Sequence, residues 1–228
     1  MQQQGAMMIV CTRPAPGREE EYHKWYDKHA EIMFGYPGME RVSRNRCVRP
    51  LGDQGGNSPD FITLYELKER TAVDDYLGSP TMEEAKKQFE EDWNGLGEVM
   101  WSGFYEPLDV LKRGPLTGNT RYTEMVGSGP KPGKEKEYLE YYRDHFTRMF
   151  AYPGIREVSY VKLFQKQAQD GKPHDYFTVY DFESQEALDA FYQDPVFTGA
   201  RTDWEQRGML AMDLQWAACY ESVKCLSR

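Results

Sequence analysis

Two of the four histidines, His29 and His145, stand at equivalent places in a stretch that occurs twice, and each follows a tyrosine by three residues, Tyr26 or Tyr142. Histidine can act as a general base near pH 7. A tyrosine hydroxyl can donate a hydrogen bond to the oxyanion that forms when an acidic carbon or a phenol loses its proton. These pairs are therefore the candidate catalytic groups. The alternative is that each histidine is a buried packing residue bonded to its tyrosine, and the sequence leaves both interpretations open.

The repeated stretch covers residues 14–43 and 130–159, which align without a gap and are identical at 15 of 30 positions. An internal repeat of this kind decides the architecture. Positions kept in both copies recur at i, i+4, i+7 and i+11, which is one face of an α-helix. They are Tyr22, Tyr26, His29 and Met33 in the first copy, and Tyr138, Tyr142, His145 and Met149 in the second. A Pro-Gly pair then ends each helix.

Aromatic residues at repeated or matching positions are the candidates for substrate binding. They are Tyr22, Trp25, Tyr65 and Trp101 in the first half, and Tyr138, Tyr180 and Trp216 in the second. Such residues could form a flat apolar pocket for an aromatic ligand. An aromatic stripe is more often core, however, and the sequence does not say which face of each strand borders the helices.

Composition narrows the class of protein. The chain has 228 residues, a net charge of −9 and a pI of about 5.1. An acidic chain without clustered Lys and Arg argues against nucleic acid and against an anionic membrane surface as partners. No apolar run approaches the roughly 18 residues of a spanning helix, and the first ten residues do not resemble a signal peptide. We therefore expect a cytoplasmic protein.

Known cofactor and metal motifs are missing from the sequence. The four cysteines include no C-x-x-C pair, which favours reduced thiols, and no His/Cys cluster has the spacing of a zinc site. There is no P-loop, no G-x-G-x-x-G and no G-x-S-x-G elbow. We expect no metal and no cofactor, although a single axial histidine would be enough for haem, so haem stays open.

The order of predicted elements is the same in both halves. In the first half we predict strands at 7–12, 39–48, 60–67 and 98–106 and helices at 17–35 and 71–93, the second helix interrupted at residues 78–80. In the second half we predict strands at 123–128, 155–165, 175–182 and 213–221 and helices at 134–151 and 185–206, with a break at Pro195. Residues 107–120 are predicted to link them.

Each half thus reads β-α-β-β-α-β, the split βαβ or ferredoxin-like unit, in which both helices cover one face of an antiparallel sheet. The other face would be bare and apolar, so a lone half would be unstable in water. We predict an α+β fold in which halves 1–112 and 113–228 pack sheet to sheet as an α+β barrel within one chain. This pseudo-dimer replaces a homodimer, and further dimerisation stays open.

A short motif adds a resemblance to a known family. The pattern W-Y-x-x-H-x7-P-G is made by Trp25, Tyr26, His29, Pro37 and Gly38, and its second copy by Tyr141, Tyr142, His145, Pro153 and Gly154. With this element order, the chain resembles the dimeric α+β-barrel superfamily, in particular its EthD-like branch in a tandem-fused form. The resemblance covers nearly the whole chain in architecture but depends on few side chains.

The resemblance implies a range of functions rather than one. The superfamily includes cofactor-independent quinone-forming monooxygenases, polyketide cyclases, muconolactone isomerases, haem-degrading enzymes and chlorite dismutases. Where a site is known, it lies between the sheet and its own helices. We predict a cofactor-independent oxygenase, cyclase or isomerase acting on a small apolar, aromatic or polyketide-like molecule. The alternatives are a non-catalytic binding or structural protein and a haem protein.

Overall fold

The computed structural model describes residues 5–52, 58–114, 121–167 and 173–228. The first part of the chain contains β1 (Ala6–Pro14), α1 (Glu19–Phe34), β2 (Met39–Pro50), β3 (Phe61–Leu67), α2 (Ala72–Leu77), α3 (Pro80–Asp92) and β4 (Gly97–Lys112). The second part contains β5 (Tyr122–Pro130), α4 (Glu135–Phe150), β6 (Ile155–Lys166), β7 (Tyr176–Phe182), α5 (Gln185–Phe191), α6 (Pro195–Asp203), the π-helical turn η2 (Trp204–Gly208), α7 (Met209–Ala211) and β8 (Met212–Ser227).

The strands form one closed antiparallel barrel in the order β1-β3-β2-β8-β5-β7-β6-β4. Within it, the strands of the first part follow the order β4-β1-β3-β2, and those of the second follow the equivalent order β8-β5-β7-β6. Pairing of β2 with β8 and of β4 with β6 closes the ring. The protein therefore has a mixed α+β fold, and closure removes the exposed strand edges that an open sheet would carry.

Strands β4 and β8 are longer than predicted. Residues 107–112 were assigned to the linker, which is wrong, because they continue β4 and pair with β6. Likewise β8 continues to Ser227 beside β2. The extra residues are held by partners far away in the sequence, so local patterning does not reveal them. The rest of the predicted linker, 115–120, lies outside the described residues, as do residues 53–57 of the predicted loop at 49–59.

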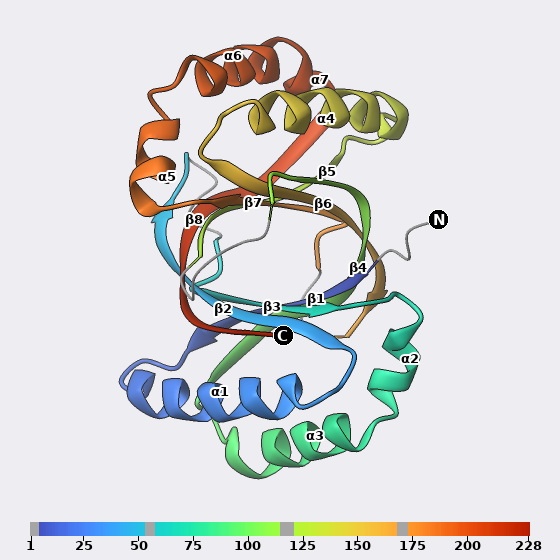
Figure 1. Ribbon diagram of the computed structural model, residues 1–228, viewed down its shortest axis with the longest axis vertical. Helices are drawn as coiled ribbons and strands as arrows, with labels where there is room; N and C mark the ends of the chain where they lie inside the picture. Colours follow the sequence, from blue (N-terminus) through green and yellow to red (C-terminus); the bar gives the residue numbers. More distant parts are fainter. Residues whose placement is uncertain (1–4, 53–57, 115–120, 168–172) are drawn as a thin grey trace.

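The helices cover the outside of the barrel on two opposite sides (Figure 1). Helix α1 packs with α3 on one side, and α4 packs with α6 and η2 on the other. The second helical segment of each half is broken, as predicted at residues 78–80 and at Pro195. Ser79 and Asp194 accept N-cap hydrogen bonds, and Pro80 and Pro195 occupy the first turns that follow.

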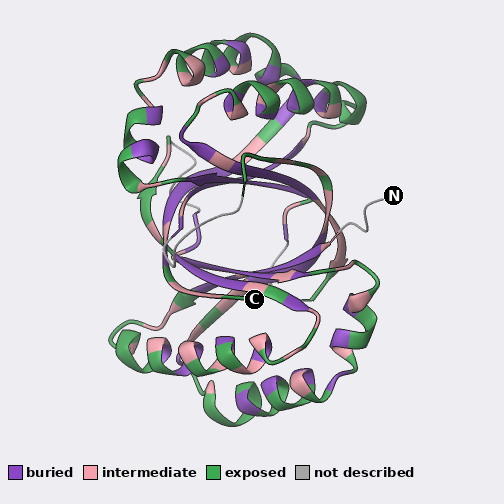
Figure 2. Cartoon of the chain, in the orientation of Figure 1, coloured by how far each residue is buried: buried purple, intermediate pink, exposed green. Residues whose placement is uncertain are grey.

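Most of the barrel wall is coloured as buried (Figure 2), and the buried side chains form separate clusters inside and outside it. The barrel interior is filled by one apolar cluster that includes Trp101, Phe177 and Trp216. Separate clusters lie between the wall and the helices of each side, around Tyr65 on one side and Tyr180 on the other. Both faces of the central strands β3 and β7 are covered, so these two strands are buried along nearly their whole length.

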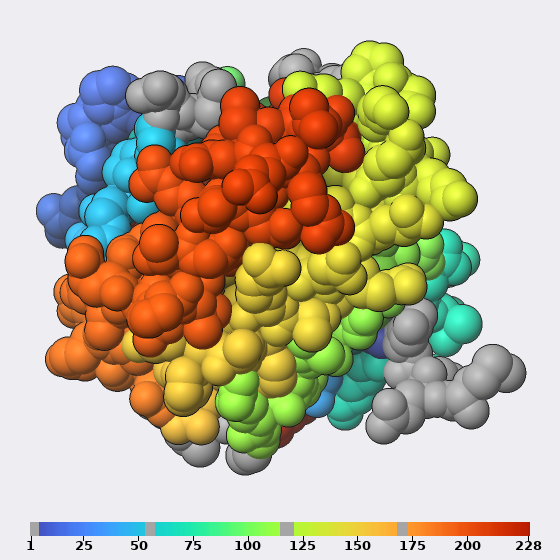
Figure 3. Space-filling view, turned by 90° about the horizontal axis from the view of Figure 1, so that it is seen from above, coloured from blue at the N-terminus to red at the C-terminus, as the bar shows by residue number. Residues whose placement is uncertain are grey.

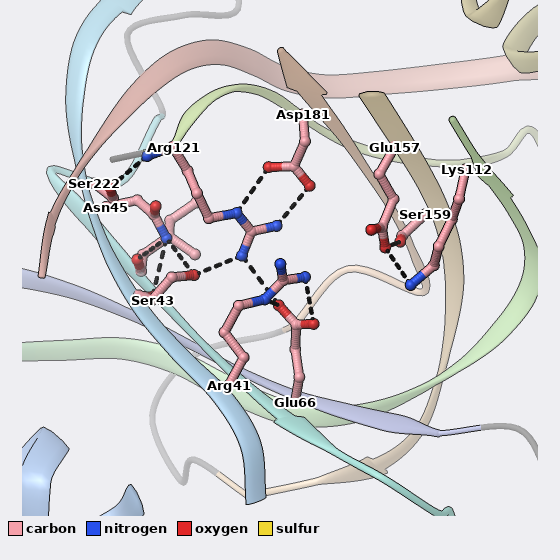
Figure 4. A network of polar contacts seen from close by, with 11 residues as sticks. Arg41, Ser43, Asn45, Glu66, Lys112, Arg121, Glu157, Ser159, Asp181 and Ser222 are labelled. Atoms are coloured by element: carbon pink, nitrogen blue, oxygen red, sulfur yellow. Dashed lines mark hydrogen bonds and ion pairs between the residues drawn. The ribbon is translucent and has the colours of Figure 1, made fainter. Parts of the chain in front are cut away.

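A polar network crosses one end of the barrel (Figure 4). The buried guanidinium of Arg121 donates two hydrogen bonds to Asp181, at 2.9 and 2.5 Å, and others to Ser43 (2.9 Å) and Glu66 (3.0 Å). Arg41 donates to the same Glu66 carboxylate at 2.8 and 2.6 Å. The network joins β2 and β3 to β7 and to the residue before β5, so it ties the two parts of the chain together.

Candidate functional site

The first candidate site is a cavity of about 400 Å³ between the barrel wall and helices α1 and α3. Four of the predicted site residues line it: Trp25, Tyr26 and His29 from α1, and Tyr65 from β3. On the α3 side, the cavity is lined by the apolar and aromatic residues Met82, Ala85, Phe89 and Trp93. The stripe of α1 identified from the sequence therefore faces a cavity for part of its length.

The second candidate site occupies the equivalent place beside α4 and α6 and measures about 760 Å³. Three predicted site residues line it: Tyr142 and His145 from α4, and Tyr180 from β7. It also contains residues that sequence analysis did not select: Glu124, Tyr192, Ala200 and Trp204. Helices α4 and α5–α7 together cover this side of the molecule (Figure 3).

His29 is held by two contacts. Its ring stacks on Trp25 at 4.5 Å with an interplanar angle of 16°. Its Nδ1 lies 2.9 Å from Oε1 of Gln88, an acceptor, so Nδ1 carries the proton and Nε2 is the basic nitrogen. Burial lowers the pKa of His29 to about 4, and the bond to Gln88 opposes this only in part. At neutral pH the imidazole is uncharged.

His145 has a similar setting with different partners. Its ring stacks on Tyr141, which replaces Trp25 of the first half, at 5.4 Å and 30°. The Tyr141 hydroxyl and Nδ1 are 3.0 Å apart. Burial lowers the pKa of His145 to about 4, with Asp203 opposing the effect. Gly208 permits this arrangement, because a Cβ there would lie 2.7 Å from the Tyr141 ring.

We expect both imidazoles to stay neutral down to about pH 4 in the folded protein. Their NMR pH titrations, assigned with single His→Asn variants, should show no midpoint between pH 5 and 8, whereas exposed histidine titrates near 6.5. The unfolded chain binds these protons first, so the histidines favour folding above about pH 6.5 and lose that contribution as pH falls toward 4. A midpoint near 6.5 for either ring would contradict this burial.

The tyrosines beside the histidines are protonated hydrogen-bond donors or acceptors at neutral pH. Burial raises the pKa of both Tyr26 and Tyr142. Tyr142 accepts a hydrogen bond of 2.8 Å from Thr178. The two sites differ in what stacks on these rings: the Arg44 guanidinium lies 4.8 Å from the Tyr26 ring centre, whereas Tyr160, its counterpart, stacks on Tyr142 at 4.6 Å.

The residues that line each cavity include buried donors with no hydrogen-bond partner among the described residues. In the first cavity these are Nε1 of Trp25 and the hydroxyl of Tyr65. In the second they are Nε1 of Trp204 and the hydroxyl of Tyr180. Buried polar groups are nearly always hydrogen-bonded in native proteins, and each exception needs a reason. The same pairing of an indole and a tyrosine in both cavities suggests a shared ligand chemistry.

Four predicted binding residues do not border the cavities. Tyr22 and Tyr138 are fully buried and bond to hydroxyls of β1 and β5, Thr12 at 2.6 Å and Ser128 at 2.9 Å. Trp101 and Trp216 belong to the barrel interior, on the opposite face of the wall from Tyr65 and Tyr180. The sequence could not resolve the facing of β4 and β8, and the structure separates these tryptophans from the histidines.

Glu124 is the main residue that sequence analysis missed. It lies on β5, its side chain is buried with 6% exposed, and it lines the second cavity. Its carboxylate accepts a hydrogen bond of 2.7 Å from Tyr192. Burial raises the pKa of Glu124 to about 7. The available signal was an acidic residue inside the otherwise uncharged predicted strand 123–128, at the position where the first half has Met8.

No family model and no curated protein matches this chain. Solved structures do match, among them a candidate monooxygenase from Fusobacterium nucleatum subsp. nucleatum with TM-score 0.66, 11% identity, and 100% of this chain and 96% of that chain covered. An anthrone oxidase-like protein gives TM-score 0.61 and 13% identity over 99% and 93% of the two chains. A haem-binding protein from Thermus thermophilus gives TM-score 0.54 and 10% identity over 97% and 92%.

At these identities the likeness shows the fold alone, which is that of the dimeric α+β barrel. Within the described ranges, no helix is both long and apolar enough to cross a membrane. The same part of the chain contains no group of three or more His, Cys, Asp or Glu side chains placed to hold a metal ion.

Proposed function

We propose that the chain is a cofactor-independent enzyme of oxygenase, cyclase or isomerase type, which binds small apolar aromatic or polyketide-like molecules between the barrel wall and its helices. The observation that carries this proposal is a pair of donors in each cavity lining that have no hydrogen-bond partner among the described residues and lie among aromatic side chains. An aromatic ligand with one or two oxygen atoms would pack against the rings and accept those hydrogen bonds. All three reaction types can start by removing a proton from such a molecule.

The proposed roles of the histidines follow from their protonation. A neutral imidazole can accept a proton, and Nε2 of His29 is the nitrogen left for this by the bond between Nδ1 and Gln88. In the second half, His145 offers a neutral ring beside Tyr142. The tyrosine hydroxyls of Tyr65 and Tyr180 would bind the oxygen on which negative charge develops. In an oxygenase, dioxygen would be the oxidant of the carbanion formed.

We also propose that the chain is a tandem fusion of two ferredoxin-like halves, 1–112 and 113–228, of the EthD-like branch. Three observations support it: the repeat of residues 14–43 at 130–159, the matching strand orders β4-β1-β3-β2 and β8-β5-β7-β6, and a cavity with His and Tyr in each half. The chain then acts as its own dimer, and its two sites evolved separately after fusion.

Binding can be tested by filling one cavity at a time. We expect Ala85→Phe to remove ligand from the first cavity and Ala200→Phe to remove it from the second, because both alanines are buried in the cavity lining. The probe is 2-tetralone, an aromatic ketone, with binding followed by calorimetry and by NMR shifts of His29 and His145. The exposed Ala190→Phe is the matched control and should retain both sites.

Failure of the wild-type protein to bind 2-tetralone and related bicyclic ketones and phenols would contradict the proposal. Binding that is unaffected by both Ala85→Phe and Ala200→Phe would place the ligand elsewhere and contradict it equally. Circular dichroism and thermal unfolding of each variant establish that a lost site reflects a filled cavity and not a lost fold.

Haem is a second candidate, because one of the solved structures with this fold is described as haem-binding. In the second cavity, the Nε2 atom of His145 could serve as an axial ligand. However, Arg201 is the single cationic side chain among the described residues that line this cavity, and haem carries two propionates. The cavity thus offers a ligand for the haem iron but only one cationic side chain for the two propionates. A sharp Soret band after adding haemin, lost in His145→Asn, would favour haem over the aromatic ligand.

A further inference from the structure

Glu124 is buried and forms no ion pair with another described residue. Its one hydrogen-bond partner among the described residues is the hydroxyl of Tyr192, which also lies 3.1 Å from Sγ of Cys219. Arg49 is nearby, but it packs over the Tyr192 ring at 4.7 Å and donates to Cys219 at 3.5 Å. No described Lys or Arg forms an ion pair with this carboxylate. Burying an unpaired carboxylate is costly, so such a residue marks a candidate functional position.

The first half of the same chain shows that the fold does not need this carboxyl. The equivalent position on β1 is Met8, which lines the first cavity just as Glu124 lines the second. The neighbouring positions on both strands are buried. A methionine fills this place without any polar requirement, so a structural role for Glu124 does not explain its presence. The second cavity therefore contains an ionisable group at a position where the first cavity has an apolar one.

We propose that Glu124 is the acid–base residue of the second cavity, and that this cavity takes aromatic ketones whose carbonyl group makes a neighbouring C–H bond acidic. The first cavity has Met8 at this position, so His29 remains the candidate base there. The proposal depends on the proposed function, because it requires an aromatic ligand beside α4.

The chemical step is a proton transfer that needs no oxidant or reductant. The Glu124 carboxylate takes the proton from the acidic C–H bond, and the electron pair of that bond forms the C=C bond of an enolate. The negative charge moves to the former carbonyl oxygen, which accepts a hydrogen bond from the Tyr180 hydroxyl. Glu124 then returns the proton to the same carbon or to a conjugated one. Atoms and charge balance within ligand and enzyme.

The protonation states of the cavity favour Glu124 over His145 as the base. A general base is most effective when its pKa lies near the working pH. Burial raises the pKa of Glu124 to about 7, while it lowers that of His145 to about 4. In the second cavity, Glu124 thus takes the role of base that the proposed function gives to a histidine, and His145 contributes a neutral part of the lining. The groups that face Glu124 from neighbouring elements are Arg49, Tyr142, Tyr180, Tyr192 and Cys219.

The test measures exchange of the acidic protons of 2-tetralone for deuterium in D₂O, by NMR, above the rate in buffer alone. We expect the wild-type protein to catalyse exchange with a rate that rises with pH and reaches half its maximum near pH 7. Glu124→Gln should reduce the catalysed rate at least about 100-fold, the usual contribution of a general base, while binding of the probe persists. Glu124→Met, which copies the first half, is the second variant.

Glu157→Gln is the matched control. Glu157 is also a buried glutamate whose pKa is raised by burial, but it lies at the end of the barrel beside Lys112 and borders neither sheet–helix cavity. This variant should retain the wild-type exchange rate. If both Glu124 variants keep that rate, or if the wild-type protein binds 2-tetralone and does not catalyse exchange, the inference is wrong while the proposed binding function stands. If the wild-type protein does not bind the probe, both fail.

Discussion

Asp181→Ala should lower the free energy of unfolding by about 3–5 kcal/mol, because it leaves the cation of Arg121 buried without its main partner. Asp181 is 1% exposed and accepts both of its hydrogen bonds from this arginine. Glu66 cannot compensate, since its carboxylate is already shared with Arg41 (Figure 4). Urea unfolding followed by tryptophan fluorescence measures the change.

A control for this effect lies two residues further along the chain. Glu183 also pairs with an arginine, Arg156, but both side chains are exposed. Glu183→Ala should therefore cost less than about 1 kcal/mol. A double change, Arg121→Met with Asp181→Leu, removes both charges and should recover most of the loss. Equal effects of Asp181→Ala and Glu183→Ala would contradict the importance of burial in this network.

The importance of Asp181 for stability cannot be read from β7 alone. β7 is buried along its whole length, so an acidic residue in it needs a compensating charge. Arg121 directly precedes β5, and Ser43 and Glu66 come from β2 and β3. No spacing in the sequence links them, because the barrel brings them together only when it closes.

The secondary structure was predictable because the internal repeat gives two copies of each pattern to compare. The stripe of Tyr26, His29 and Met33 and its copy on α4 predicted the two helices within one or two residues. The breaks before Pro80 and Pro195 followed from backbone chemistry alone. The closed antiparallel barrel of a mixed α+β fold agrees with the expected architecture at that level.

The composition of the sites was less predictable, because it depends on which face of each strand meets the helices. Tyr65 and Trp101 were equal candidates by residue type, but the first borders a cavity and the second fills the barrel. Comparison of the two halves identifies only site residues that both halves share. Glu124 has no counterpart in the first half, so comparing the repeats passed over the one buried carboxyl among the residues lining the two cavities.

The difference in free energy of unfolding between Glu124→Gln and the wild type should change in favour of the variant by about 3 kcal/mol between pH 4 and pH 8. The folded carboxyl has its pKa raised from 4.5 to about 7 by burial. As pH rises from 4.5 toward 7, the unfolded chain releases its proton first, so the wild type loses stability over this window. A shift of about 2.5 units corresponds to about 3 kcal/mol, and glutamine does not ionise.

The comparison isolates one group, because every other titrating residue is common to the two proteins and cancels in the difference. The amide oxygen of the glutamine can still accept the hydrogen bond from Tyr192, so packing changes little. Urea unfolding of both proteins at intervals from pH 4 to pH 8 gives the difference curve. A flat curve would mean that the carboxyl ionises as it does in water. Glu124 would then be reached by solvent, and its carboxylate would be a weaker base than the proposed proton transfer requires.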